Sequence, residues 1–377
     1  NGFPTTKDEE WKYTSLKKVI ANEYNIENKG QVVVDSVIEK YSLGFENQII
    51  FSDGKLINIP TIKGVSISGF SEFESNTNNS ILNLNKSLSQ NGFTISIDKN
   101  TVVESPIEIL FISTTETNFS QYRNLISIAE NAEVKFVERI QNLNNSSSFV
   151  NNFTRINCDK NTKIEYNKIQ NNTSESQLID TVNVYQEQDS TCDINTLIFG
   201  GSFTRNNLNF EQNGFNCESN MNGVSVLDNN QLADNHTFVD HKSANCRSNE
   251  MYKGIYLDNS KGVFNGKIMV RPDAQKIDAF QSNNNLLLSE NSSIDSKPQL
   301  EIYADDVKCS HGCTIGQLDA DALFYMRSRG IGVEEAKAVL TYAFASEAIE
   351  NISVDQVKLL SKKLLAQKLN VELDFSV

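Results

Sequence analysis

The densest group of residues able to do chemistry in this 377-residue sequence lies in the run 308–313. The run holds two of the six Cys and one of the three His, as Cys309, His311 and Cys313. A thiolate and an imidazole are suitable ligands for zinc or for an iron–sulfur species. On a strand the three side chains would share one face. Three donors are too few to close a four-ligand site, so the pattern predicts that a partner chain supplies the rest.

A reading without any ligand role fits the same residues equally well. The two Cys would then be small buried hydrophobic residues, and His311 would cap the helix that follows. The other two His, His236 and His241, are five residues apart, which places them on opposite faces of a strand. A shared metal is therefore awkward, and we expect one of them to pack in the core and the other to be exposed.

Strands are expected to position His236 and His241, because apolar and polar residues alternate from about 50 to 305. The alternation is clear in 94–97 and 133–137. A short polar turn recurs about every 30 residues, at Asn100, Asn131, Asn161 and Ser190, with weaker echoes at Asn259 and Asn291. A strand-only repeat of this length predicts a β-helix. A two-sheet sandwich also fits the alternation, but it gives no reason for a constant period.

Helices are expected at both ends of the chain. Near the N-terminus, Thr6 and Glu9 fit a capping box that precedes an apolar stripe of Trp11, Leu16, Val19 and Ile20. From about 317, Leu318, Ala322, Leu323 and Met326 follow a helical period that ends at Gly330. A second helix is expected around 336–344, and a third after a capping box formed by Ser353 and Gln356. We therefore predict a mainly β protein with an N-terminal helical segment (1–48), a β-helix core (49–305) and a C-terminal helical domain (306–377).

Composition excludes several classes of function. The sequence has 48 acidic and 34 basic residues, a net charge of −14, which argues against nucleic acid and anionic membrane surfaces. It contains no apolar run long enough to span a membrane and no secretory signal, and its scattered Cys do not form a disulfide framework. A cytoplasmic location is the simplest interpretation. We also find no catalytic or phosphate-binding motif, so an ATPase is not expected.

The run 300–316, followed by 323–330, resembles the C-terminal signature of the SufB/SufD family of iron–sulfur cluster assembly proteins. Further matches are 264–270, 281–288 and the entry segment 10–14, and the resemblance is strongest over 234–330. SufB-like members carry a Cys at the position of Asn283 and a Glu at that of Gly312, so both residues favour the SufD branch. Full-length family members also carry an N-terminal helical extension that has no counterpart in this sequence.

The resemblance implies a right-handed parallel β-helix that pairs with the β-helix of SufB. It also implies C-terminal helices that dock on SufC, an ABC-type ATPase, with Leu323, Phe324, Tyr325 and Arg327 as candidate contacts. The nascent cluster would form at the SufB interface with a SufB Cys and a SufD His, a role that falls on His311, with Cys309 as its near neighbour. No ligand role is carried onto Cys313, because the family usually has Ala there.

The resemblance thus predicts a non-catalytic scaffold, with ATP hydrolysis in SufC. We expect no stably bound cofactor, a transient iron–sulfur cluster or iron at the SufB interface, and a possible homodimer when the chain is isolated. Two alternatives remain. One is a SufB-type scaffold in a system that lacks SufD, and the other is a β-helix enzyme acting on polysaccharides.

Overall fold

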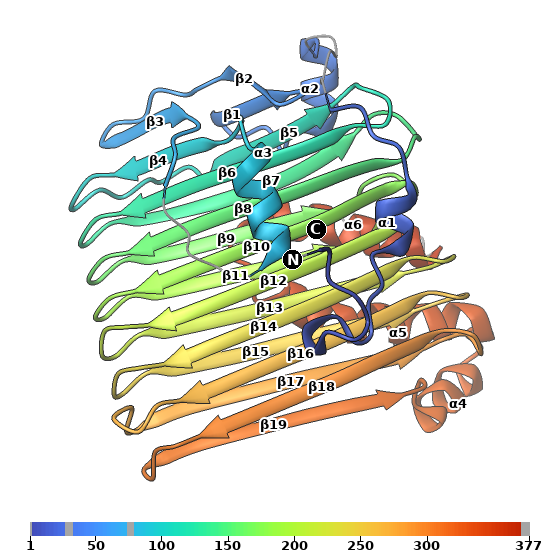
Figure 1. Ribbon diagram of the computed structural model, residues 1–377. Helices are drawn as coiled ribbons and strands as arrows, with labels where there is room; N and C mark the ends of the chain where they lie inside the picture. The colour runs from blue at the N-terminus through green and yellow to red at the C-terminus, as the bar shows by residue number, and fades with distance from the viewer. Residues whose placement is uncertain (1, 27–32, 74–78, 371–377) are drawn as a thin grey trace.

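Two parallel sheets lie face to face, and each coil of the chain adds one strand to each sheet (Figure 1). The computed structural model describes residues 2–26, 33–73 and 79–370. The strands of the first sheet are β1 (Asn47–Ser52), β2 (Lys55–Asn58), β5 (Ile107–Ser113), β7 (Glu133–Asn142), β9 (Lys163–Gln170), β11 (Thr191–Ile198), β13 (Glu218–Leu227), β15 (Arg247–Tyr256), β17 (Ile277–Leu287) and β19 (Val307–Gly316). Those of the second are β3 (Val65–Gly69), β4 (Phe93–Ile97), β6 (Phe119–Ile128), β8 (Ser148–Cys158), β10 (Ser176–Gln186), β12 (Phe203–Gln212), β14 (Leu232–His241), β16 (Lys261–Val270) and β18 (Ser293–Ile302).

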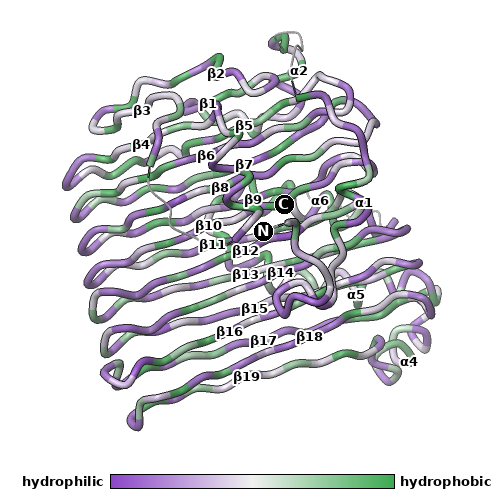
Figure 2. The backbone as a smooth tube through the Cα atoms, viewed as in Figure 1, coloured by the Kyte–Doolittle hydropathy of each residue, from purple (hydrophilic) through white to green (hydrophobic). Residues whose placement is uncertain are grey.

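The coiled arrangement confirms the predicted β-helix. From β4 onward, consecutive strands alternate between the sheets, and neighbours within a sheet are parallel. Apolar and polar residues alternate along the strands, so one side of each strand faces the interior (Figure 2). A sandwich of antiparallel hairpins is excluded because, from β4 onward, the strands of one sheet are joined only through the other sheet. We call this stack of coils the solenoid.

In one column of turns, successive coils place a residue with a left-handed backbone conformation at the same position. The side chains of these residues hydrogen-bond from coil to coil. Asn100, Asn131 and Asn161 have φ values of 60°, 62° and 55°, which Asn tolerates better than most residues. The Asn131 amide donates to the Asn100 side-chain oxygen at 2.8 Å, and Asn161 donates to Asn131 at the same distance. The column continues with further left-handed residues at Asp189, Asn216 and Asn245.

The echoes expected at Asn259 and Asn291 do not belong to this column. They lie between β15 and β16 and between β17 and β18, where the chain crosses back at the opposite end of the coils. The period is also not constant, since the intervals from Asn100 to Asn245 along the column are 31, 30, 28, 27 and 29. The register is constant along each pair of neighbouring parallel strands, so the turns between strands absorb the difference in coil length.

The two ends of the solenoid differ in how they are closed. At the first end, β2 pairs antiparallel with β1 and β3 pairs antiparallel with β4. The interior there is aromatic, with Phe51 and Phe111 stacked at 4.8 Å between ring centroids and Tyr122 at 4.3 Å from Phe111. At the other end, β18 and β19 are the outermost strands of their sheets. We call the edge formed by these two strands the open end.

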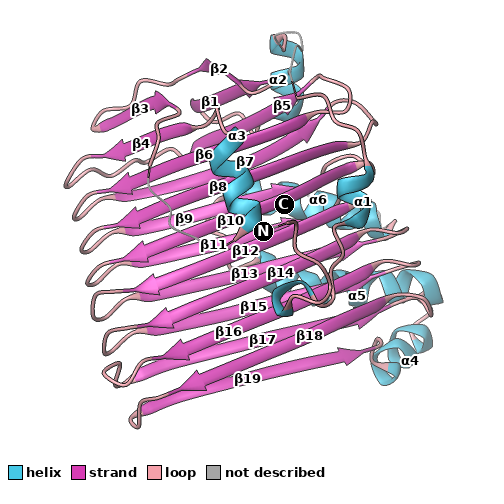
Figure 3. Cartoon of the chain, viewed as in Figure 1, coloured by secondary structure: helices cyan, strands magenta, loops and turns pink. Residues whose placement is uncertain are grey.

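Helices cover the outer faces of both sheets (Figures 1 and 3). On the first sheet, Ala345, Ile349 and Leu365 of the C-terminal helices pack on Val224 and Ile255. On the second sheet lie α3 and the N-terminal residues. The helical elements are a 3-10 turn (Glu9–Trp11), α1 (Lys17–Ala21), α2 (Asp35–Tyr41), α3 (Ser80–Leu88), α4 (Ala320–Ser328), α5 (Val333–Ile349) and α6 (Asp355–Leu369). None of the helices in the described part of the chain is long and apolar enough to cross a membrane.

The three C-terminal helices are confirmed, including the stop at Gly330, which has a φ of +89°. Two of the predicted caps are wrong. Asp8 precedes the first helical turn in place of Thr6, and Ser353 donates to Glu165 on β9 and does not cap α6.

Three further expectations about the ends and middle of the chain need revision. Ile20 is exposed, although the rest of the N-terminal apolar stripe is buried. The helix α3 interrupts a stretch that was expected to contain strands alone. Finally, β19 is the last strand of the solenoid and lies inside the range 306–377 assigned to the helical domain, whose first helix begins at Ala320.

Candidate functional site

His311 lies near the middle of β19, and its direct neighbour in the parallel ladder is Gln281 of β17. On β17 the inward residues Ala279 and Gln281 are buried, whereas Asp278 and Phe280 are exposed. The register therefore directs His311 toward the interior of the solenoid. Because β19 ends its sheet, this interior-facing imidazole nevertheless remains exposed.

Cys309 and Cys313 share the inward face of β19 with His311, as predicted from their spacing. Cys309 is half-buried and packs against Ala279, and this burial raises the pKa of its thiol. Cys313 is exposed, and its Sγ donates to the Ser296 hydroxyl on β18 at 3.2 Å. The two Cys are therefore not equivalent, and the reading of both as buried hydrophobic residues is wrong.

The interpretation of His311 as a helix cap is also wrong. The first helix after β19 is α4, and its N-cap is Asp319. The Asp319 carboxylate accepts hydrogen bonds from the backbone N–H groups of Asp321 and Ala322 at 2.8 and 3.2 Å. The imidazole thus has no structural task in starting the helix and is available at the open end.

Buried polar residues lie directly behind His311 in the interior. Glu250 of β15 accepts hydrogen bonds from the Thr237 hydroxyl at 2.6 Å and from the Gln281 amide at 3.1 Å. Burial raises the pKa of the Glu250 carboxyl to about 7. Sequence reasoning missed this group, although polar residues at inward positions of an alternating strand were a signal that could have identified it.

The candidate metal ligands at the open end, His311, Cys309 and Cys313, do not complete a metal site by themselves. Among the described residues, no three His, Cys, Asp or Glu side chains are grouped so that they could hold a metal ion. The imidazole of His311 and the thiol of Cys313 are exposed side by side on one face, and both suit iron or zinc. Further ligands would have to come from another chain that approaches the open end.

Comparison with known proteins agrees with this architecture. A family model described as the SufBD core domain of the SUF system for FeS cluster assembly matches residues 111–344. The iron–sulfur cluster assembly protein SufD of Escherichia coli is 30% identical over 95% of this chain and 87% of its own length. This chain belongs to the SufBD family. A SufBD family protein of Synechocystis sp. is 27% identical over 93% of this chain and 84% of its own length. SufD of Bacillus subtilis is 24% identical over 73% of this chain and 63% of its own length.

The two positions that favour the SufD branch of the SufBD family have different surroundings. Asn283 is buried, and its side-chain oxygen accepts hydrogen bonds from Asn285 and Ser296, both at 2.8 Å. Gly312 stands beside His311 with open space where a Cβ would be. Packing therefore fixes Asn283 in place, whereas it does not require glycine at 312.

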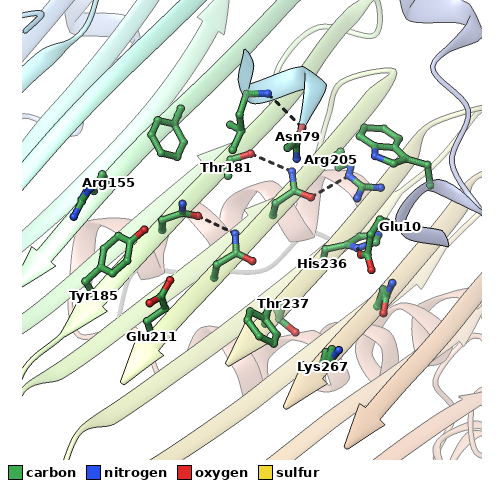
Figure 4. A pocket seen from close by; sticks show the side chains of 18 of the residues that line it. Glu10, Asn79, Arg155, Thr181, Tyr185, Arg205, Glu211, His236, Thr237 and Lys267 are labelled. Atoms are coloured by element: carbon green, nitrogen blue, oxygen red, sulfur yellow. Dashed lines mark hydrogen bonds and ion pairs between the residues drawn. The ribbon is translucent and has the colours of Figure 1, made fainter. Parts of the chain in front are cut away.

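The outer face of the second sheet carries a cavity of about 550 Å³ beneath α3 and the N-terminal residues (Figure 4). A polysaccharide-cleaving member of this fold class would need free carboxylates there. The described lining includes two, and both are in ion pairs. Glu211 lies 2.5 Å from the Lys242 amine, and Glu10 contacts His236. The cavity thus gives no support to that alternative.

His236 lies on this outer face, but the N-terminal residues cover it, so the expectation that one of the two His is exposed is wrong. The Asp234 carboxylate is 2.9 Å from its Nε2, and Glu10 is 3.4 Å from its Nδ1. Arg205 pairs with Asp234 at 2.7 Å, and its guanidinium lies 3.8 Å from the centre of the Trp11 ring. Burial alone would lower the pKa of the His236 imidazole, but the nearby Asp234 carboxylate outweighs burial and Arg205 and raises it.

This arrangement predicts a pH-dependent contribution of His236 to stability. The protonated imidazole is bound by two carboxylates only in the folded chain, so its stabilising effect is complete below the usual imidazole pKa of about 6.5. The effect is lost as the pH rises through the higher pKa of the folded state. We expect the difference in free energy of unfolding between wild type and His236→Gln, measured with urea, to shrink as the pH rises above that value.

The exposed His311 provides the matched control for this measurement, since its side chain forms no ion pair with the described residues and the difference between wild type and His311→Gln should not shrink in this way. A difference between wild type and His236→Gln that is constant, or that grows with pH, would contradict the contribution of the ion pairs. The second His of the pair, His241, is fully buried inside the solenoid and lies 3.0 Å from the Ser248 hydroxyl. The two His therefore lie on opposite faces of β14, as predicted.

The candidate partner contacts on α4 are mostly exposed. The exposed fractions of Phe324 and Tyr325 are 73% and 58%, and Arg327 is exposed as well. Leu323 is half-buried and lines a cavity of about 650 Å³ between α4, α5 and the last coils. Exposed aromatic residues of this kind are typical of protein–protein contacts. Their role in binding an ATPase stays a prediction.

Proposed function

We propose that this chain is a non-catalytic scaffold subunit of a cytoplasmic SufB–SufC–SufD complex for iron–sulfur cluster assembly. In this role His311 binds iron of the nascent cluster, with Cys309 as its near neighbour, and a SufB-type chain supplies the remaining ligands. The cluster is cargo that leaves the complex and is not a resident cofactor. The main support is the exposure of an interior-facing imidazole on the last strand of a solenoid that is closed at its other end.

The open end is the proposed surface for the SufB-type partner. Both β18 and β19 are ten residues long, and each has one side without a neighbouring strand in its sheet. Such an edge is a template for pairing with another chain. Lys297 and Pro298 make β18 a poor template, whereas β19 contains no proline. Strand pairing through β19 would place the partner beside His311, and a second copy of this chain could occupy the same edge when SufB is absent.

The C-terminal helices are the proposed docking site for the ATPase SufC. Every residue of α4 is at least partly exposed, whereas α5 is anchored to the solenoid. Lys253 of β15 contacts Glu347 of α5 in an ion pair, and Ile349 packs in the cluster that joins α5 to the first sheet. The ATPase would thus bind an exposed surface helix, α4, whose neighbour α5 is packed against the solenoid.

This connection suggests how ATP could act on the site. Two bound SufC subunits that come together would rotate α4 and α5 of SufD and the equivalent helices of SufB. From α5 the path to His311 is short, because β15 pairs with β17 and β17 pairs with β19. A rigid solenoid transmits a small rotation along its ladder. The rotation would open the junction with SufB and give iron and sulfur access to the ligands.

Co-expression tests the proposal directly. The chain should co-purify with a SufB-type homologue and a SufC-type ATPase, and the purified complex should hydrolyse ATP and accumulate a cluster on reconstitution. Recovery with the ATPase alone would favour the alternative of a SufB-type scaffold in a system without SufD. Failure to bind either protein would refute the proposal.

Phe324→Asp should weaken binding of SufC by at least about tenfold, because an aromatic hot-spot residue at an interface typically contributes about 2 kcal/mol or more. The substitution should leave the fold intact, since the side chain is 73% exposed. Binding measured by calorimetry and the thermal unfolding midpoint of the free chain check both parts. Phe215→Asp is the matched control, because Phe215 is also exposed, at 48%, and lies at the opposite end of the coils. Equal binding by the two variants would remove α4 from the interface.

A further inference from the structure

We propose that Gln281 is a positioning residue that accepts a hydrogen bond from one ring nitrogen of His311, and that Glu250 fixes the orientation of the Gln281 amide. This inference deepens the proposed function of His311 and rests on it for its biological consequence. The hydrogen bond itself is a property of the free chain and can be tested without iron, sulfur or a partner.

The orientation of the Gln281 amide is determined by its surroundings. Its Nε2 donates to the Glu250 carboxylate at 3.1 Å, and the same carboxylate oxygen accepts from the Thr237 hydroxyl at 2.6 Å. While the Glu250 carboxyl is ionised, a flipped amide would bring two oxygens together and lose this bond. The amide oxygen of Gln281 must therefore face away from Glu250.

That amide oxygen is buried and has no hydrogen-bond partner within the described chain, although Gln281 is fully buried. An unpaired buried acceptor costs about 1–3 kcal/mol, so a donor within reach of this oxygen would stabilise the folded chain. His311 is the direct ladder neighbour of Gln281 on the same inward face. Neighbouring strands lie about 4.8 Å apart, which brings an imidazole N–H of His311 within reach of this oxygen after a side-chain rotation.

The interior is shaped to hold the amide. A Cβ at Gly266 of β16, on the facing sheet, would lie only 2.2 Å from the Gln281 Nε2. Glycine at this position therefore leaves the space that the amide occupies. Glu250, Gln281 and Gly266 belong to three different strands. Because all three contribute to holding the amide, the arrangement is specific and not a chance contact.

The consequence for His311 is a fixed tautomer. An imidazole has two ring nitrogens, and the partner of one decides which nitrogen is bare and able to bind metal. A hydrogen bond to the Gln281 oxygen favours the tautomer of His311 whose proton is on the bonded nitrogen. The other nitrogen is then bare and faces the open end, where a cluster would form. The ring would then present its bare nitrogen toward the open end without a change of tautomer or free rotation.

Nitrogen NMR of the full chain, labelled with ¹⁵N only in His and free of metal, tests the inference. At pH about 8, above the usual imidazole pKa of about 6.5, the two ring-nitrogen shifts report the tautomer ratio of each neutral imidazole. In Gln281→Met, which keeps the length of the side chain but removes the amide, we expect the His311 ratio to change by about fivefold. This is the ratio that one hydrogen bond of ordinary net strength supports.

Glu250→Gln is the second variant, because it keeps the shape of the side chain but lets the Gln281 amide adopt either orientation. It should shift the His311 ratio in the same direction by a smaller amount. The signals of His236 and His241 are internal controls and should not move, which also shows that each variant is folded. An unchanged His311 ratio in Gln281→Met would overturn the positioning role.

The NMR result for Gln281 and the proposed ligand role of His311 can fail independently of each other. If the His311 ratio shifts but His311→Ala still assembles clusters, the positioning holds and the ligand role fails. If the ratio stays the same while His311→Ala blocks assembly, the ligand role holds and the positioning by Gln281 is wrong.

Discussion

His311→Ala should reduce cluster formation on the reconstituted complex by at least about tenfold while the complex itself still assembles. Tenfold is a lower bound, because changes to groups that only support metal ligands already cost roughly 10–100-fold in metal affinity or activity. The substitution removes an exposed side chain from an edge strand, so the fold should be unaffected. Cluster absorbance after anaerobic reconstitution and size-exclusion chromatography of the complex measure the two parts.

Variants of the neighbouring Cys show whether the effect is specific to the imidazole. Cys313→Ala should retain cluster formation, because the resemblance to the SufB/SufD family carries no ligand role onto this position. Cys309→Ala should have an intermediate effect, since the thiol is half-buried and burial raises its pKa, which keeps it protonated and a poor ligand. Normal cluster yields from His311→Ala would show that the imidazole is not a ligand, whatever the Cys variants do.

The architecture of the core was predictable because two independent signals agreed. Alternation showed strands, and a turn near every 30 residues showed that the strands form coils. The helix α3 escaped notice because residues 82–85 alternate apolar and polar side chains as a strand does, although Ile81, Leu84 and Leu88 follow a helical period. The helix is held on the second sheet by Asn85, which is buried and donates hydrogen bonds to the backbone of both β6 and β8. A contact between segments 37 and 66 residues apart is not visible in local sequence.

The candidate site was predictable only in part, for a similar reason. The types and spacing of Cys309, His311 and Cys313 were enough to place them on one face of a strand. The role of Gln281 and Glu250 was not, because a polar residue in an alternating strand is normally assigned to the outside until the register is known. The pairing of Glu10 with His236 joins residues 226 positions apart, so only the folded chain brings them together.

A second buried ionic group lies deeper in the solenoid, far from the open end. Lys168 of β9 lies 3.1 Å from the Glu138 carboxylate and 2.5 Å from that of Asp180, and all three are almost completely buried. The Tyr166 hydroxyl donates to Glu138 at 2.9 Å. Burial raises the pKa of Asp180 to about 6, although the charge of Lys168 partly offsets this effect. One cation thus compensates two carboxylates in an interior that water does not reach.

Lys168→Met should lower the free energy of unfolding by about 3–5 kcal/mol at neutral pH, because removing one partner of a buried ion group leaves uncompensated charge. The cost should also depend on pH. Without Lys168, the pKa of the Asp180 carboxyl would be raised further above its value in the unfolded chain, so folding would take up protons. The stability lost in the variant should therefore grow as the pH rises from about 5 to 8.

Lys99→Met provides the matched control for this prediction. Lys99 also pairs with a glutamate of a neighbouring coil, Glu130, at 2.6 Å, but both side chains are substantially exposed, at 56% and 39%. Exposed pairs contribute little, so this variant should stay within about 0.5 kcal/mol of wild type at both pH values. Urea unfolding of the three proteins compares them directly. Equal losses in the two variants, or a loss in Lys168→Met that does not change with pH, would show that burial does not control the energetics of this group.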